Sequence, residues 1–234
     1  TSIISFLIWT FKSRFFKIKI DYHLNNNILR FSFPFFISSS MLLLLQWIDI
    51  ILLGYFKSSS DVGVYSVAVK ISMFSSIILF AINSIVAPKI SEIFSQKKVD
   101  ELKSIINKSS MLIFFTTIPI LILILIFSSF ILGVFGEDFL DGEKCLRILI
   151  VGQFFNILCG SVGYILNMTE NQNIFRNITI FAVLINIFFN LILIPTYGII
   201  GAAIASTISL ILWNIISSFC IYIKFNISTI WFVK

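Results

Sequence analysis

Charged side chains are scarce in this sequence. Only 12% of its 234 residues are Asp, Glu, Lys or Arg, whereas 58% are hydrophobic. Soluble domains carry about 25% charged and about 45–50% apolar residues. The composition therefore argues against a water-soluble globular domain and indicates an integral membrane protein.

Histidine and cysteine are also rare. The single histidine, His23, lies in a basic stretch, and Cys145, Cys159 and Cys220 lie in or beside apolar runs without CxxC spacing. This pattern predicts neither a metal site nor a disulfide framework, and no cofactor is expected. The GxSxG, HExxH and P-loop motifs are missing as well, so we do not expect an enzyme.

The net charge of +6 comes from basic residues spread over the loops rather than gathered in one patch. Nucleic acid binding is therefore not expected. Only Lys57 and Lys144 fall in loops assigned to the outside, whereas the other loop Lys and Arg residues fall inside. This bias predicts that the N-terminal linker and the C-terminal tail are cytoplasmic.

Six apolar runs are each long enough to cross a bilayer, which needs about 20 residues. Residues 1–11 are expected to end a preceding membrane helix, 12–30 to form a basic cytoplasmic linker with a loop at its three consecutive asparagines, and 224–234 to form a tail. The fold class predicted is all-α and polytopic. The predicted spans are 31–56, 62–88, 111–135, 145–168, 174–194 and 201–223.

Pro88 is expected to end the second span, because proline cannot donate the next helical hydrogen bond. Apolar residues at helical spacing in 91–106 then predict an amphipathic segment on the inner membrane surface. A solvated helix is an equally good interpretation of this segment.

Two charges lie inside predicted spans, Asp49 in the first and Lys70 in the second. At about 1.5 Å per residue, they lie about 10 Å and about 12 Å from the outer ends of their helices. An ionisable group at such depth is costly and suggests function. Two alternatives remain open. The charges neutralise each other as a pair, or both line a water-filled cavity in which Lys70 receives an anionic substrate and Asp49 exchanges a proton or cation.

Further candidates are polar or basic residues within spans. Arg147, near the outer end of the fourth span, either adds a cation at the cavity mouth or reaches a lipid phosphate. Gln46 lies one turn before Asp49 and shares its face. Gln153 and Asn156 share a stripe that either packs against another helix or lines a cavity.

Other polar residues are assigned to structure. Asn186 and Asn190 lie one turn apart in the fifth span, where packing is favoured over a cavity role. Tyr55 and Tyr65 are expected to anchor the outer interface, and the small residues of 201–206 predict a helix contact.

Three segments resemble a known family. The segment 186–206, NIFFNLILIPTYGIIGAAIAS, resembles the C-terminal signature of bacterial polysaccharide flippases, including O-antigen flippases. The segment 61–72 resembles the start of the eighth helix of that family, and 87–109 resembles its following inner loop. The resemblance extends from about residue 31 to the end. It places the chain in the multidrug/oligosaccharidyl-lipid/polysaccharide exporter superfamily, as the C-terminal six-helix lobe of a two-lobe, twelve-helix fold.

The resemblance implies that the protein flips undecaprenyl-diphosphate-linked oligosaccharides across the bacterial inner membrane by alternating access, for lipopolysaccharide or a related polymer. The implied partners are this lipid-linked substrate, membrane lipids, the N-terminal lobe and other polysaccharide-assembly proteins. Lys70 matches a position that is often basic in the family, whereas Asp49 matches no motif of it. Cation-coupled multidrug extrusion is the alternative function, and a membrane-embedded glycan polymerase or acyltransferase is a second.

Overall fold

The computed structural model describes residues 22–230, with side chains from Ser32 onward. The described part of the chain is helical and contains no strand. The packing described below is that of the compact unit Pro34–Lys234. The elements are α2 (Tyr22–Phe56), α3 (Ser59–Ser95), α4 (Val99–Ile126), α5 (Ser128–Gly133), the 3-10 helix η2 (Glu137–Gly142), α6 (Glu143–Cys159), α7 (Val162–Met168), α8 (Gln172–Tyr197) and α9 (Ile199–Phe225).

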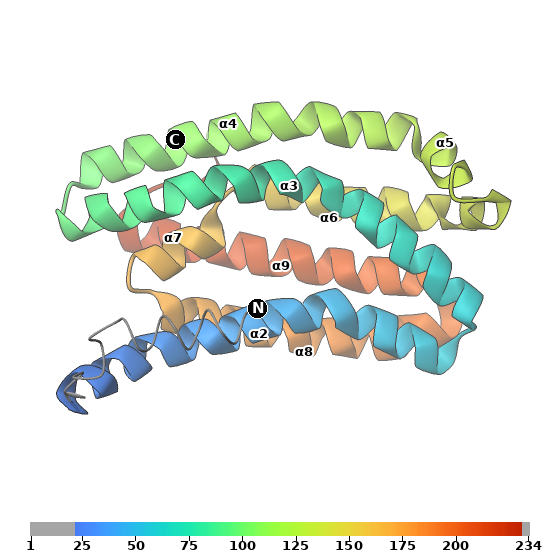
Figure 1. The fold of residues 1–234 in the computed structure, drawn as a ribbon, viewed down its shortest axis with the longest axis horizontal. Helices are drawn as coiled ribbons and strands as arrows, with labels where there is room; N and C mark the ends of the chain where they lie inside the picture. Colours follow the sequence, from blue (N-terminus) through green and yellow to red (C-terminus); the bar gives the residue numbers. More distant parts are fainter. Residues whose placement is uncertain (1–21, 231–234) are drawn as a thin grey trace, which may run out of the picture. The chain divides into compact units, whose positions relative to one another are not determined.

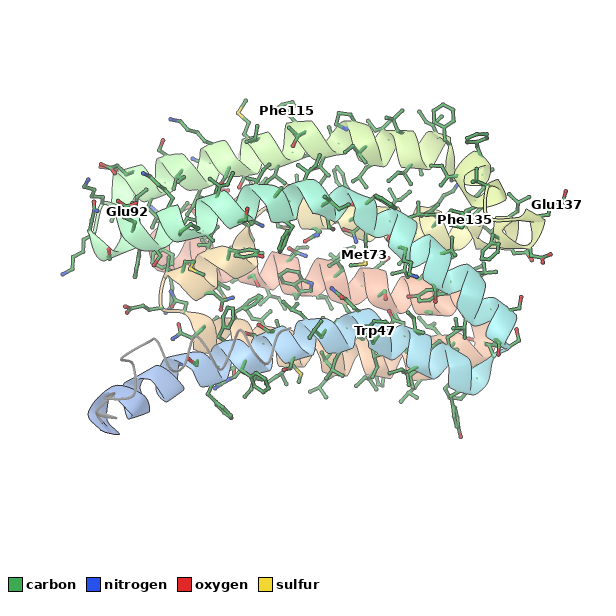
Figure 2. All side chains as sticks on the ribbon, viewed as in Figure 1. Trp47, Met73, Glu92, Phe115, Phe135 and Glu137 are labelled. Atoms are coloured by element: carbon green, nitrogen blue, oxygen red, sulfur yellow. The ribbon has the colours of Figure 1, made fainter. Side chains whose placement is uncertain are left out.

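Five of these helices are long and apolar enough to cross a membrane, and α6 with α7 forms a sixth candidate span bent by 42°. Their outward faces carry large apolar side chains such as Phe115, which points away from the bundle in Figure 2 and is 50% exposed. In a soluble protein such a surface would drive aggregation, whereas lipid accommodates it. The all-α membrane fold expected from the composition is confirmed.

The helices form antiparallel hairpins that share one bundle (Figure 1). The α2–α3 and α8–α9 turns lie at the same end, on the right in Figure 1, whereas the α3–α4 turn lies at the other. We call the first end the Lys57 end. There Ser58 caps α3 by accepting from the Asp61 N–H at 3.2 Å, while the Asp61 carboxylate accepts from the Ser58 N–H at 3.2 Å.

The α8–α9 hairpin is unusually close. Gly198 has φ of 57°, a left-handed conformation that favours glycine, and reverses the chain. A Cβ added at Gly201 would lie 2.2 Å from the Leu193 carbonyl oxygen. Glycine is therefore required at position 201 so that the start of α9 can touch the backbone of α8.

The hairpin formed by α3 and α4 differs from two of the predictions. Helix α3 continues through Pro88 to Ser95, so the proline does not end the helix. Ile90 and Ile93 beyond it are buried in one apolar cluster with residues of α4 and α7. The packing of Ile90 and Ile93 in this cluster favours continuation of the helix, although an internal proline costs roughly 3 kcal/mol.

The segment 91–106 is likewise not one amphipathic helix. Residues 91–95 end α3, a tight turn follows with Lys97 at φ of 57°, and α4 begins at Val99. Leu102 and Ile106, expected to face the membrane surface, are buried instead in the same apolar cluster as Ile90 and Ile93 of α3. The helical spacing was correct, but the two halves belong to antiparallel helices.

Other boundaries also differ from the predicted ones. Residues 22–30, expected in the linker, already form the first turns of α2, including the three asparagines expected in a loop. The predicted third span divides at Phe127, between α4 and α5. The expected helix at 1–11, the first part of the linker and the end of the tail lie outside the described residues.

The predicted fourth span is broken at Gly160, which has φ of 69°. A Cβ there would lie 2.8 Å from the Ser110 hydroxyl, so both conformation and space require glycine. The Ser161 hydroxyl donates to the Asn83 side-chain oxygen of α3. Periodicity alone could not reveal the break, because the apolar pattern continues across it.

We expect Gly201→Ala to lower the free energy of unfolding by about 2–3 kcal/mol, because the added methyl group meets backbone that cannot move aside. Thermal unfolding in detergent micelles measures this loss. Gly63→Ala is the matched control, since a Cβ at Gly63 meets nothing within 4 Å. It should leave stability unchanged or raise it by up to about 1 kcal/mol. Equal stability of the two variants would contradict the close contact between α8 and α9.

Candidate functional site

Asp49 lies in the interior of the bundle, with 3% of its surface exposed. One carboxylate oxygen accepts from the Asn190 side-chain N–H at 2.6 Å. The other accepts from the Tyr65 hydroxyl at 3.0 Å and from the Ser206 hydroxyl. The acid of α2 is thus held by donors from α3, α8 and α9.

Asn186 extends this group. It lies one turn before Asn190 and accepts from the same Asn190 amide nitrogen at 3.0 Å. Within the described part of the chain, the Asn186 amide nitrogen and the Asn190 side-chain oxygen are buried without a hydrogen-bond partner. We call Asp49, Tyr65, Asn186, Asn190 and Ser206 the Asp49 cluster. Asn186 nonetheless interacts with Asp49, so the Asn190 oxygen is the group of the cluster left without an interaction.

Burial explains why Asp49 needs these partners. A carboxyl group taken out of water is costly unless it is hydrogen-bonded, and a membrane offers no solvent to help. Leu53, one turn later on α2, is fully buried in the apolar core and fixes this face of α2 inward. Asp49 is the only acidic residue of the cluster, so a single bound proton or cation would neutralise it.

Lys70 does not join Asp49. Its side chain is exposed, and it makes neither a hydrogen bond nor an ion pair with any residue that the structure describes. Lys70 follows Tyr65 by five residues, which rotates it by about 140° around α3. Because Tyr65 faces Asp49, Lys70 faces another side. The simple pair, one of the two alternatives for these charges, is not formed in this structure.

Gln46 is also exposed and outside the Asp49 cluster, although it lies one turn from Asp49. Arg147 is exposed, but its guanidinium donates to the Glu143 carboxylate at 2.6 Å. The Ser128 hydroxyl donates to the same oxygen at 3.1 Å. The charge of Arg147 is therefore already paired at the Lys57 end of the bundle.

Gln153 and Asn156 form a second polar group, in which every member is neutral. The Gln153 side-chain oxygen accepts from the Ser76 hydroxyl at 2.9 Å and from the Asn156 amide at 3.3 Å. Asn156 in turn accepts from Asn214 at 3.3 Å. Gln153 and Asn156 are buried. This amide network joins α3, α6 and α9, a placement that corresponds to the packing alternative for the stripe.

Four members of the Asp49 cluster, Tyr65, Asn186, Asn190 and Ser206, are predicted from the sequence to have mainly structural roles. Tyr65 is fully buried rather than anchored at the interface, and Ser206 does more than provide a small packing surface. One signal could have found them. Tyr65, Asn190, Ser206 and Asp49 each lie about 9–10 Å along their helices from the Lys57 end, so their side chains meet at one depth.

Comparisons with known proteins find similarity to the MatE family and to proteins named as a flippase and as a transporter. The family described as MatE matches residues 34–192. A probable low-salt glycan biosynthesis flippase, Agl15, of Haloferax volcanii is 29% identical over 191 residues, covering 79% of this chain and 40% of the relative. A putative O-antigen transporter of Shigella flexneri is 28% identical over 171 residues, covering 71% of this chain and 40% of the relative. The chain thus spans less than half the length of these relatives.

Solved structures show the same fold. A multidrug resistance MATE family transporter of the MOP superfamily, in an outward-facing conformation, superposes with a TM-score of 0.72 at 16% identity, covering 87% of this chain and 46% of the transporter. A MOP superfamily transporter from Pyrococcus furiosus superposes with a TM-score of 0.71 at 18% identity, covering 86% of this chain and 45% of that protein. The chain therefore has the fold of about half of such a transporter.

We expect Tyr65→Phe to lower the free energy of unfolding by about 1–3 kcal/mol, because Asp49 loses one donor while the ring packing is kept. Chemical unfolding in micelles measures the change. Tyr55→Phe removes the same hydroxyl from a side chain that is 82% exposed and should have no effect. A Tyr65→Phe protein as stable as the Tyr55→Phe protein would show that the Tyr65 hydroxyl does not support Asp49.

Proposed function

Because the chain belongs to the MatE family, we propose that its protein flips lipid-linked oligosaccharides across a membrane by alternating access, with this chain as the C-terminal lobe. The relatives named as flippases and as an O-antigen transporter support this substrate class. The carrier proposed is undecaprenyl diphosphate, in the inner membrane of a bacterium. The loop charges support an inward-facing N-terminal linker and C-terminal tail.

The observation that carries the proposal is the exposed Lys70, which lies within the apolar helix α3 and makes no ion pair with the described residues. A lysine at this depth cannot remain in contact with hydrocarbon without a large cost, so the face that carries it needs water or an anion. A diphosphate supplies two adjacent anionic groups that an ammonium can contact. We assign Lys70 to the diphosphate. Gln46 and, once released from Glu143, Arg147 are secondary contacts.

Asp49 has a different role in this proposal. It is hydrogen-bonded on three sides and lies away from the face of Lys70, so it does not meet the substrate directly. The Asn190 side-chain oxygen, left without an interaction, leaves room for a change in the bonding of the cluster. We assign Asp49 as the coupling acid. Binding or release of a proton or cation by its carboxylate favours one conformation of the lobe over the other.

Replacing Lys70 tests the substrate contact. In a flippase-deficient strain, the full-length protein carrying Lys70→Ala should restore about tenfold less surface polysaccharide than the unmodified protein, because a charge-assisted contact of about 1.5 kcal/mol or more is lost. Lys108→Ala removes the same charge from an exposed position on α4 and should restore normal amounts. Normal polysaccharide with Lys70→Ala would exclude an essential role for Lys70.

Replacing Asp49 tests the coupling. In proteoliposomes, Asp49→Asn should abolish the stimulation of flipping by an imposed proton or cation gradient, while exchange without a gradient continues. A fluorescent lipid-linked oligosaccharide measures both rates. Stimulation that survives Asp49→Asn would remove Asp49 from coupling. Accumulation of amphipathic dyes in the same vesicles, without flipping, would replace the proposal by multidrug extrusion.

A further inference from the structure

Several backbone carbonyls near the C-terminal end of α8 accept from donors of its own last residues or of the following glycine. The Thr196 hydroxyl donates to the Ile192 and Leu193 carbonyls at 3.3 and 3.2 Å. The Gly198 N–H donates to the Ile194 carbonyl at 2.9 Å. The last four carbonyls of a helix, here those of residues 194–197, lack donors within the helix. The Thr196 and Gly198 donors come from the end of the hairpin itself.

The Pro195 carbonyl has a partner from outside this hairpin. It accepts from the Lys57 ammonium at 3.2 Å, and Lys57 belongs to the turn between α2 and α3. Helix α8 has no basic residue in its own last turn. Lys57 therefore supplies from another hairpin the positive charge that a helix C-terminus favours.

Lys57 is itself held firmly in place. Its N–H donates to the Leu53 carbonyl at 2.8 Å, which continues α2, and the next residue, Ser58, is the capping residue of α3. The aliphatic part of its side chain passes over the turn between α8 and α9, since a Cβ at Gly198 would lie 3.6 Å from the Lys57 Cε. The contact thus joins two rigid turns rather than two loose loops.

We propose that Lys57 is a positioning residue, a clasp that keeps α2 against α8 so that Asp49 stays bonded to Asn190. The role in transport rests on the proposed function, whereas the clasp itself does not. Lys57 lies about 12 Å beyond Asp49 along α2, and Pro195 lies about 7.5 Å beyond Asn190 along α8. Two ties at different heights oppose both sliding and tilting of α2. Helix α2 can leave α8 only when the ammonium contact and the carboxylate contact both open.

Hydrogen exchange of the full-length protein in nanodiscs tests the clasp without substrate. Lys57→Met removes the ammonium but keeps an apolar stem over Gly198, so the turn should still fold. Amides of residues 46–56 should exchange about three- to tenfold faster, the effect of losing one hydrogen bond to a charged group at a partly exposed site. Lys57→Arg should restore slow exchange, because a guanidinium can donate to the same carbonyl.

The matched control is Lys144→Gln, which removes an exposed charge from the same end of the bundle and should leave exchange in 46–56 unchanged. Unchanged exchange in Lys57→Met, or no rescue by Lys57→Arg, would overturn the clasp whatever the protein transports.

In flipping assays, Lys57→Met should change the turnover rate about threefold or more and leave the KM for lipid-linked substrate unchanged, since Lys57 does not contact it. A change in KM alone would also overturn the assignment. Absence of flipping in the unmodified protein would contradict the proposed function and leave the exchange result standing.

Discussion

The buried carboxyl group of Asp49 needs hydrogen-bond donors, and the helices of the Lys57 half of this lobe are arranged around it. Asp49 accepts from three side chains on three other helices, and none of these donors carries a charge. Without them the acid would remain in a low-dielectric interior with nothing to compensate it. The positions of α2, α3, α8 and α9 relative to one another are therefore fixed by a polar requirement as well as by apolar packing.

The lobe separates its polar groups by charge. The Asp49 cluster contains an acid, whereas the amide network of Ser76, Gln153, Asn156 and Asn214 has no ionisable member. Both groups keep a buried polar atom without a hydrogen-bond partner, so charge is what distinguishes them. A neutral network can join helices without responding to pH or to a membrane potential. Under the proposed alternating access, one region of the lobe would change its charge while another keeps its helices together.

Much of the fold could be predicted from the sequence, because span length and hydropathy follow from the thickness of a bilayer. The site was harder to predict. Asp49 and Lys70 were found as unusual charges, but their separation around the bundle depends on the rotation of α3, which a uniformly apolar helix does not reveal. Tyr65 was placed at the interface because its residue type favours that location, and only the buried acid beside it explains its actual position. The prediction that the helix ends at Pro88 was wrong for a related reason. The tendency of proline to end a helix was outweighed by the packing of Ile90 and Ile93 beyond it.

The break between α6 and α7 depends on two features from distant parts of the sequence. Gly160 has a positive φ that a residue with a Cβ adopts only with strain, so the chain can turn there. The Ser161 hydroxyl then donates to the Asn83 side-chain oxygen of α3, which gives the turned segment a partner outside its own span. The shape of this span therefore depends on its neighbour α3 as well as on its own residues.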